Sequence, residues 1–188
     1  MIKINDFEKI GFDITWKLID IGFKTHTIFF NELLPEDILE YAISIISGKD
    51  VNSEVIDLAC EYKENIDKIS QYIKTLANKE KSYYDIEFRK WRVLYISKQL
   101  TSYNIDYIKG LIELGDIWAK FDFPLDSPHI FQGRENLITP EEYYTEENYK
   151  KLFDKHIEWM EEEIELIKNI NKKEQPIIDM DTMENTQT

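Results

Sequence analysis

Apolar residues recur three and four positions apart along most of this chain, which is the spacing of one face of an α-helix. The clearest example is a stripe whose members stand at i, i+4, i+7 and i+11: Tyr84, Phe88, Trp91 and Tyr95. We find no fixed sequence period of the kind that marks a helical repeat array. The pattern predicts an all-α fold of roughly six or seven helices, arranged as an irregular antiparallel bundle or a short stack of helix pairs.

Start and stop signals divide the first part of the chain into one helix and one extended segment. Asp13 is expected to cap a short helix, and Gly22 is expected to end it. The next segment, Thr25–Phe30, is rich in β-branched and aromatic residues, which favour extended backbone. The fold therefore has at most one minor strand, near residues 25–30.

Three further helix starts are visible before the aromatic stripe. Pro35 predicts the start of a helix, because a proline at the first helical position gives up no hydrogen bond. Gly48 is expected to end that helix. Ser53 is expected to cap a short helix, and Asn65 to begin a longer one.

The second half of the chain predicts two more helical regions around a loop. Asn104 is expected to cap a helix whose inward-facing residues are Ile105, Ile108, Leu111, Ile112 and Trp118. Two prolines and a glycine make residues 121–137 a loop. Thr139-Pro140-Glu141-Glu142 is a capping box, and it predicts a long helix to about Ile170 with a break near Thr145.

Length and composition are those of one folded unit. The chain has 188 residues, of which 43% are hydrophobic, enough to bury a core. We expect a single helical domain over residues 1–170 and a disordered polar tail over residues 171–188. The first residues lack a basic region followed by an apolar run, so we expect no signal peptide. No apolar stretch approaches the roughly 20 residues that span a bilayer, so no membrane contact is predicted.

The chain is strongly acidic. Its 37 aspartates and glutamates outnumber 23 lysines and arginines, which gives a formal net charge of −14. Residues 141–188 alone carry 14 acidic and 6 basic residues. Such a surface favours docking onto a basic protein and repels the phosphates of nucleic acid. An ordinary solvated face has the same composition, so charge by itself leaves both interpretations open.

Residues that commonly carry chemistry are sparse. The sequence has no glycine-rich phosphate loop, no HExxH and no paired Cys-x-x-Cys. The three histidines, His26, His129 and His156, are far apart in sequence, and His156 is expected to be a satisfied core histidine. Cys60, the single cysteine, excludes an internal disulfide and is expected to be a small buried residue; together these features favour the cytoplasm. We predict no catalytic residue, metal ligand or cofactor.

Five carboxylates are the candidate partner-binding residues. Asp116, Asp122 and Asp126 gather around the loop after the Trp118 helix, and loops on a rigid scaffold commonly carry function. Glu161 and Glu162 belong to an acidic run on the last helix. Turn chemistry is the favoured alternative for the three aspartates, because two of them stand just before proline steps.

Arg89 and Arg92 flank Trp91 on the stripe helix and permit two interpretations. They are spaced to clamp a carboxylate or phosphate of a ligand. They are equally able to form an internal ion pair that anchors this helix to an acidic one. We favour the internal ion pair.

Several short motifs resemble one bacterial family. They are Glu87-Phe88-Arg89-Lys90-Trp91-Arg92 and the run from Gly115-Asp116-Ile117-Trp118 to Pro124, with shorter likenesses at Ile14–Lys17 and Glu40–Ala42. Over residues 12–165 the chain is similar to the domain-of-unknown-function family numbered twenty-two forty-seven. That resemblance implies a small cytoplasmic immunity protein of a polymorphic toxin system, one that binds a cognate toxin domain. It transfers no catalytic residues.

We therefore predict a binding protein that neutralises a basic bacterial toxin domain by covering it with an acidic surface. One alternative is a carboxylate- or metal-dependent hydrolase, although no metal-ligand spacing is present. A second is a non-catalytic regulatory or scaffold module. The sequence does not indicate an oligomeric state.

Overall fold

The computed structural model describes residues 2–46, 51–101, 104–134 and 136–174. These residues form nine α-helices and one π-helical segment, and they contain no strand. The elements are α1 (Ile4–Lys9), α2 (Trp16–Asp20), the π-helical segment (Ile21–Thr25), α3 (Pro35–Ile45), α4 (Ser53–Ala59), α5 (Ile66–Lys79), α6 (Tyr84–Gln99), α7 (Tyr107–Ala119), α8 (Pro140–Tyr143) and α9 (Glu146–Glu174). The predicted all-α class is confirmed.

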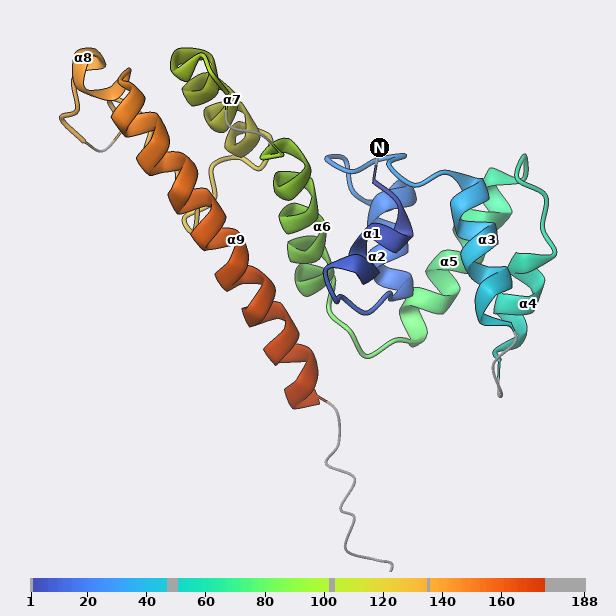
Figure 1. Ribbon diagram of the computed structural model, residues 1–188. Helices are drawn as coiled ribbons and strands as arrows, with labels where there is room; N and C mark the ends of the chain where they lie inside the picture. The colour runs from blue at the N-terminus through green and yellow to red at the C-terminus, as the bar shows by residue number, and fades with distance from the viewer. Residues whose placement is uncertain (1, 47–50, 102–103, 135, 175–188) are drawn as a thin grey trace, which may run out of the picture.

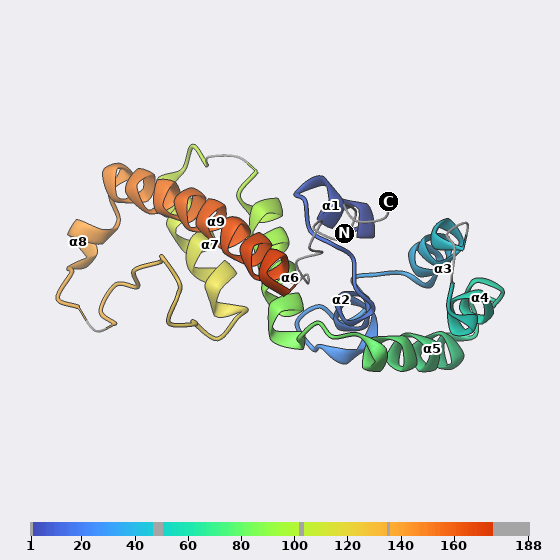
Figure 2. The same ribbon diagram turned by 90° about the horizontal axis from the view of Figure 1, so that it is seen from below.

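Helix α6 lies in the middle of the molecule (Figure 1). Helix α9 packs along α6 and α7 on one side, and α2 packs against α6 and α5 on the other. Helices α3 and α4 pack together at the end of the molecule opposite α8, and this separation is also clear from below (Figure 2). The fold is therefore a row of packed helices in which α6 contacts α9 on one side and α2 on the other.

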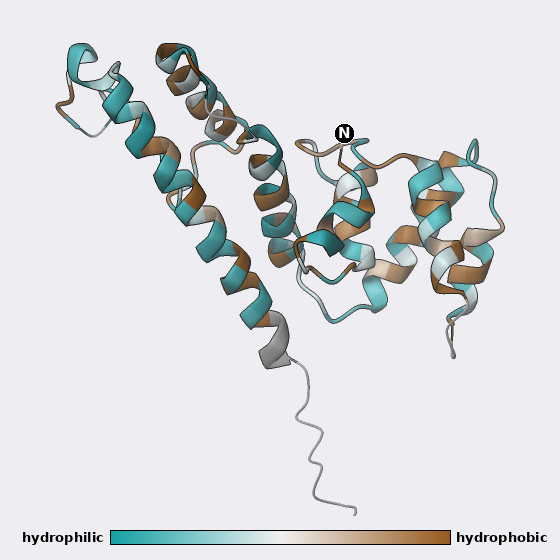
Figure 3. Cartoon of the chain, viewed as in Figure 1, coloured by the Kyte–Doolittle hydropathy of each residue, from teal (hydrophilic) through white to brown (hydrophobic). Residues whose placement is uncertain are grey.

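A single cluster of buried apolar side chains runs through this row, from Ile2 to Ile167. Hydrophobic and hydrophilic residues alternate around most helices (Figure 3), as expected for amphipathic helices that each bury one face. No helix within the described ranges is both long and apolar enough to cross a membrane.

The first predicted helix differs from expectation at both ends. Thr15, not Asp13, caps α2, because its hydroxyl accepts a hydrogen bond from the Leu18 N–H at 3.0 Å. Gly22 does not stop the helix but lies in the π-helical segment that continues it. There the indole of Trp91 occupies the space where a side chain would stand. Gly22 was thus misread as a stop because its role is close packing.

The segment Thr25–Phe30, the one place where a strand was expected, contains none. The residues that follow it are hydrogen-bonded to the π-helical segment, since the Asn31 and Leu33 N–H groups donate to the carbonyls of Phe23 and Gly22, respectively. Phe29 is fully buried and stacks on Trp91 at 5.1 Å between ring centroids. Within this segment Phe29 packs into the core, whereas Phe30 is 53% exposed, and no β-ladder forms.

Helix boundaries in the middle of the chain agree with the start signals more closely. Pro35 occupies the first turn of α3, as predicted. The stop at Gly48 lies outside the described residues. The cap of α4 is Asn52, whose side chain accepts from the Glu54 N–H, so Ser53 is one residue too late. Asn65 precedes α5 as expected.

Helix α7 shows the largest error in predicted burial. Its cap is Asp106 and not Asn104, since the Asp106 carboxylate accepts two backbone N–H bonds. Leu111 and Trp118 are buried as predicted, whereas three residues expected inside face solvent: Ile105, Ile108 and Ile112. Ile105 lies before the first turn of α7, and α7 packs mainly against α9, so the described residues leave the face with Ile108 and Ile112 uncovered.

The C-terminal helical region follows the prediction to its last turn. The Thr139–Glu142 capping box forms in α8 with both reciprocal hydrogen bonds. The helical conformation is interrupted around Thr145, between the end of α8 and the start of α9. Helix α9 continues to Glu174, so it passes the predicted start of the tail at residue 171. Residues 175–188 lie outside the described ranges.

Candidate functional site

Two arginines of α6 form the centre of a charge network between α6 and α9. Arg89 donates from Nε and Nη2 to the two carboxylate oxygens of Glu163, both at 2.7 Å. Arg92 lies 3.3 Å from the same carboxylate and donates two hydrogen bonds to Asp126 in the loop after α7. Glu163 is only 6% exposed, so its contacts with both arginines are largely shielded from water.

This network confirms the internal ion pair favoured for the two arginines. Both guanidinium groups already bind carboxylates of the chain, so neither Arg89 nor Arg92 is a free clamp for a ligand. The hydrogen bonds that Arg89 donates to the Glu163 carboxylate are the main cause that raises the pKa of Arg89. Bidentate geometry of this kind fixes the rotation of α9 relative to α6.

Arg92 also lies against two tryptophans. Its Cζ is 5.2 Å from the ring centroid of Trp159 and 6.0 Å from that of Trp118. The two indoles meet edge to face at 5.0 Å. A planar guanidinium stacks well on such rings, so the charge network is joined to the aromatic core.

The three candidate aspartates do not converge on one point. All three are exposed, and Asp126 is in addition hydrogen-bonded to Arg92. Asp122 and Phe123 have φ angles of 56° and 51°, which place both in the left-handed region of a turn. The favoured interpretation of Asp122 as a turn residue agrees with this backbone geometry.

The two candidate glutamates of α9 belong to an exposed ridge. We define the α9 ridge by four solvent-exposed carboxylates at i, i+3, i+4 and i+7: Glu158, Glu161, Glu162 and Glu165. The acidic residue inside this run, Glu163, points the other way and is buried against the arginines. The buried ion pair therefore sets which face of α9 turns its negative charge to solvent.

Two histidines that are distant in sequence meet in the core. His156 is fully buried, accepts a hydrogen bond at Nε2 from the Trp118 indole at 2.7 Å, and donates from Nδ1 to the Leu152 carbonyl. The prediction of a satisfied core histidine is confirmed. His129 lies 5.5 Å away between ring centroids and hydrogen-bonds through Nε2 to the Tyr143 hydroxyl.

Burial lowers the pKa of both His129, to about 3, and His156, so both stay neutral in the folded chain. An unfolded histidine titrates near pH 6.5, so the unfolded chain binds more protons below that pH and stability is lost as the pH falls. We expect His129 to cost about 2 kcal/mol of stability between pH 7 and pH 5.

Urea unfolding of the wild type and of His129→Gln at both pH values measures this loss. Burial raises the pKa of Glu80 and of Glu87. These two carboxyl groups therefore increase the stability of the folded chain as the pH falls, which is opposite to the effect of the histidines. The difference between wild type and variant isolates the histidine. A variant whose stability depends on pH as steeply as that of the wild type would contradict the expectation.

Buried and half-buried charged groups also join the start of α2 and the residues before it to α6 and to the end of α5. Lys90 is fully buried, pairs with Glu87 at 2.9 Å and donates to the Asp13 carbonyl. The Glu80 carboxylate accepts from the backbone N–H groups of Trp16 and Lys17, where α2 begins. This network was not predicted, because nothing in the sequence separates a buried lysine from a surface one.

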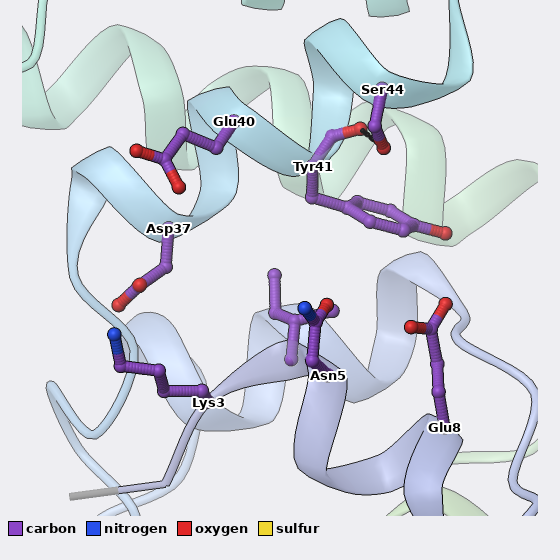
Figure 4. Close-up of a pocket in the computed structure, with 8 residues that line it drawn as sticks. Lys3, Asn5, Glu8, Asp37, Glu40, Tyr41 and Ser44 are labelled. Carbon is purple, nitrogen blue, oxygen red and sulfur yellow. Dashed lines mark hydrogen bonds between the residues drawn. The ribbon is translucent and has the colours of Figure 1, made fainter.

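A polar cavity of about 440 Å³ lies between α1 and α3 (Figure 4). Asn5 and Glu8 of α1 face Tyr41 across it, and Lys3 extends toward Asp37 (Figure 4). Burial and then the negative charge of nearby glutamates raise the pKa of Tyr41 to about 12, so its hydroxyl remains protonated. Glu40 also lines this cavity, which makes it mainly acidic.

The sequence contained only an indirect signal for this cavity. Glu40 appeared in the sequence only as part of the family likeness at Glu40–Ala42. Proximity to α1 was not foreseeable, because it depends on how α1 folds back onto α3.

No metal site was found in the described ranges, where no group of three or more His, Cys, Asp or Glu side chains is placed to hold an ion. Cys60 is exposed, so the prediction of a buried cysteine is wrong. It follows the last turn of α4, beyond the buried Leu58, and its side chain no longer shares the inward face.

Comparison with known proteins identifies a family and nothing more specific. A family model described as "Uncharacterized protein conserved in bacteria (DUF2247)" matches residues 4–164. No curated protein matches the chain, and no solved structure does.

Proposed function

The chain belongs to the DUF2247 family of bacterial proteins, and we propose that this member is an immunity protein that binds and neutralises a basic toxin domain. Neutralisation consists of covering the active site or substrate groove of the toxin with an acidic surface. The proposal gives the chain no catalytic step and no cofactor.

The α9 ridge is the observation that carries the proposal. Residues 158–165 contain five glutamates and no basic residue, and four of the five are exposed. Like charges three and four residues apart cost a helix a few tenths of a kcal/mol for each pair. A basic partner would remove that repulsion, so the arrangement suits a surface that is covered on binding.

Rigid support adds to this argument. Glu163 is held by Arg89 through two hydrogen bonds, and the ridge lies on the opposite side of the same helix turns. This ion pair holds α9 in one orientation against α6, so the four ridge carboxylates keep fixed positions on the surface. Preorganised charge of this kind loses little freedom on binding and speeds the diffusional encounter with a basic surface.

The proposal expects a basic toxin domain to be encoded immediately upstream and the purified chain to bind it. Replacing Glu161 and Glu162 by glutamine removes two charges from the ridge. We expect the association rate constant with that domain to fall about fivefold at low salt, with little change at high salt. Stopped-flow fluorescence measures the association rate constant at both salt concentrations.

The control is the double variant Asp57→Asn/Glu141→Gln, which removes the same charge from exposed residues of α4 and α8. Its association rate is expected to change less than that of the ridge variant. A wild-type chain that neither binds the upstream domain nor protects cells from it would overturn the proposed function.

A further inference from the structure

Helix α3 lies at the far end of the molecule from α8 (Figure 1) and borders a second concave surface. This groove of about 430 Å³ lies between α3 and the segment that follows α4. Its apolar lining comes from Leu39, Ile43 and Tyr62. Ile43 is 58% exposed and Tyr62 is 74% exposed, so both retain much apolar surface that a partner would remove from water.

Four glutamates rim this groove: Glu36, Glu40, Glu61 and Glu64. Lys63 is the one basic residue of the lining and pairs with Glu36 at 3.1 Å. Within the described ranges Glu40 and Glu64 form no salt bridge, so their charge remains available. The surface is an apolar groove with an acidic rim.

The groove and the polar cavity of Figure 4 lie on the two flanks of α3 and share Glu40. Glu8 and Asp37 add two carboxylates on the cavity side, where Lys3 extends toward Asp37 and leaves Glu8 and Glu40 to face a cation. A chain segment lying across α3 thus meets apolar surface on one flank and a cavity suited to a cationic side chain on the other. Neither flank offers the clustered cations that a phosphate would need.

We propose that this face of α3 anchors the toxin through a basic amphipathic segment of that protein, with an apolar side chain in the Ile43–Tyr62 groove and lysine or arginine side chains on the glutamates. The inference rests on the proposed function, because it names the part of the partner that is recognised. Charge complementarity chooses this occupant, since the rim is net negative and the groove floor is apolar. The α9 ridge then contributes attraction at long range, and the α3 face contributes the contacts that slow dissociation.

Ile43→Asp separates a groove contact from simple charge attraction. The change adds negative charge, so attraction alone predicts tighter binding of a basic partner, whereas loss of the apolar anchor predicts weaker binding. The matched control is Ile112→Asp on α7, because Ile112 is 52% exposed and the charge change is identical. Both positions lie on exposed helix faces, so neither variant is expected to unfold the chain.

The probe is a synthetic helical peptide of leucine and lysine with the leucines on one face, titrated against the full-length chain by fluorescence anisotropy. We expect Ile43→Asp to weaken binding at least tenfold, and Ile112→Asp to leave it unchanged or tighter. Glu36→Gln/Glu40→Gln is expected to weaken binding and to reduce its salt dependence.

Equal or tighter binding by Ile43→Asp would overturn the inference, as would a loss of equal size in Ile112→Asp. The same variants titrated against the upstream toxin domain separate the two proposals. If the wild type neutralises the toxin and Ile43→Asp does so equally well, the α3 assignment is wrong and the proposed function stands. If the wild type binds the peptide through α3 but does not bind the toxin, the proposed function fails by itself.

Discussion

Replacing Gly22 by alanine is expected to lower the free energy of unfolding by about 3 kcal/mol, at the upper end of overpacking effects. A Cβ atom at this position would stand 2.0 Å from Cζ2 and 2.5 Å from Cη2 of Trp91. The indole has little room to retreat, because it is fully buried and its Nε1 donates to the Leu18 carbonyl at 2.8 Å. Phe29 stacks on one part of it and Phe7 meets it edge to face.

Gly115→Ala is the matched control for this prediction. An added Cβ there meets Phe131 and His129 at 3.6 and 3.7 Å, which are ordinary contact distances. Because Gly115 lies inside α7, alanine is expected to stabilise the chain by about 0.5–1 kcal/mol. Urea denaturation of both variants measures the difference, and equal stabilities would show that the π-helical segment and α6 do not pack as described.

Glu163→Ala is expected to lower the free energy of unfolding by about 3–5 kcal/mol, because it leaves buried arginine charge without its carboxylate. Arg89 loses both of its bonds, and Arg92 keeps only Asp126. Arg92 is buried, so its charge cannot move into solvent, whereas the Arg89 side chain is 26% exposed and regains part of its hydration.

Glu162→Ala is the control in the adjacent residue. It deletes the same side chain from the exposed ridge and is expected to change stability by less than about 0.5 kcal/mol. Thermal and urea unfolding of the two variants gives the comparison. Similar stabilities for both would mean that the α6–α9 ion pair does not anchor the fold.

The helical class of this fold was predictable because amphipathic spacing and helix caps are local features. Pro35 and the Thr139–Glu142 box each define a helix start within a few residues, and the structure confirms both. The stripe from Tyr84 to Tyr95 likewise falls on one helix. Such signals require no knowledge of what the helix packs against.

Errors arose where packing between distant segments decides the outcome. Gly22 is of the residue type that commonly ends a helix, but here its missing side chain lets the indole of Trp91, which is distant in sequence, pack against the backbone. Ile112 has the spacing of a core residue, yet it is 52% exposed because no helix of the described residues covers that face of α7. The segment Thr25–Phe30 has strand composition but finds its partners in an aromatic cluster.

The candidate site was predictable in part for the same reason. Exposure of Glu161 and Glu162 follows from an acidic run on one helix, and the sequence indicated that run. The ion pair of Asp126 with Arg92 was not predicted, because it joins the loop after α7 to a helix 34 residues earlier in the chain. The α3 groove depends on the approach of the segment after α4 to α3, and no local pattern reports that approach.

The central claim is that this chain acts by presenting shape and negative potential to a basic protein. Its most direct test is to titrate the activity of the purified upstream toxin domain with the full-length chain over a range of salt concentrations. The account predicts stoichiometric inhibition at low salt that weakens as salt is added. Undiminished toxin activity at every ratio, or turnover of a small molecule by the chain that disappears when one carboxylate is removed, would contradict it.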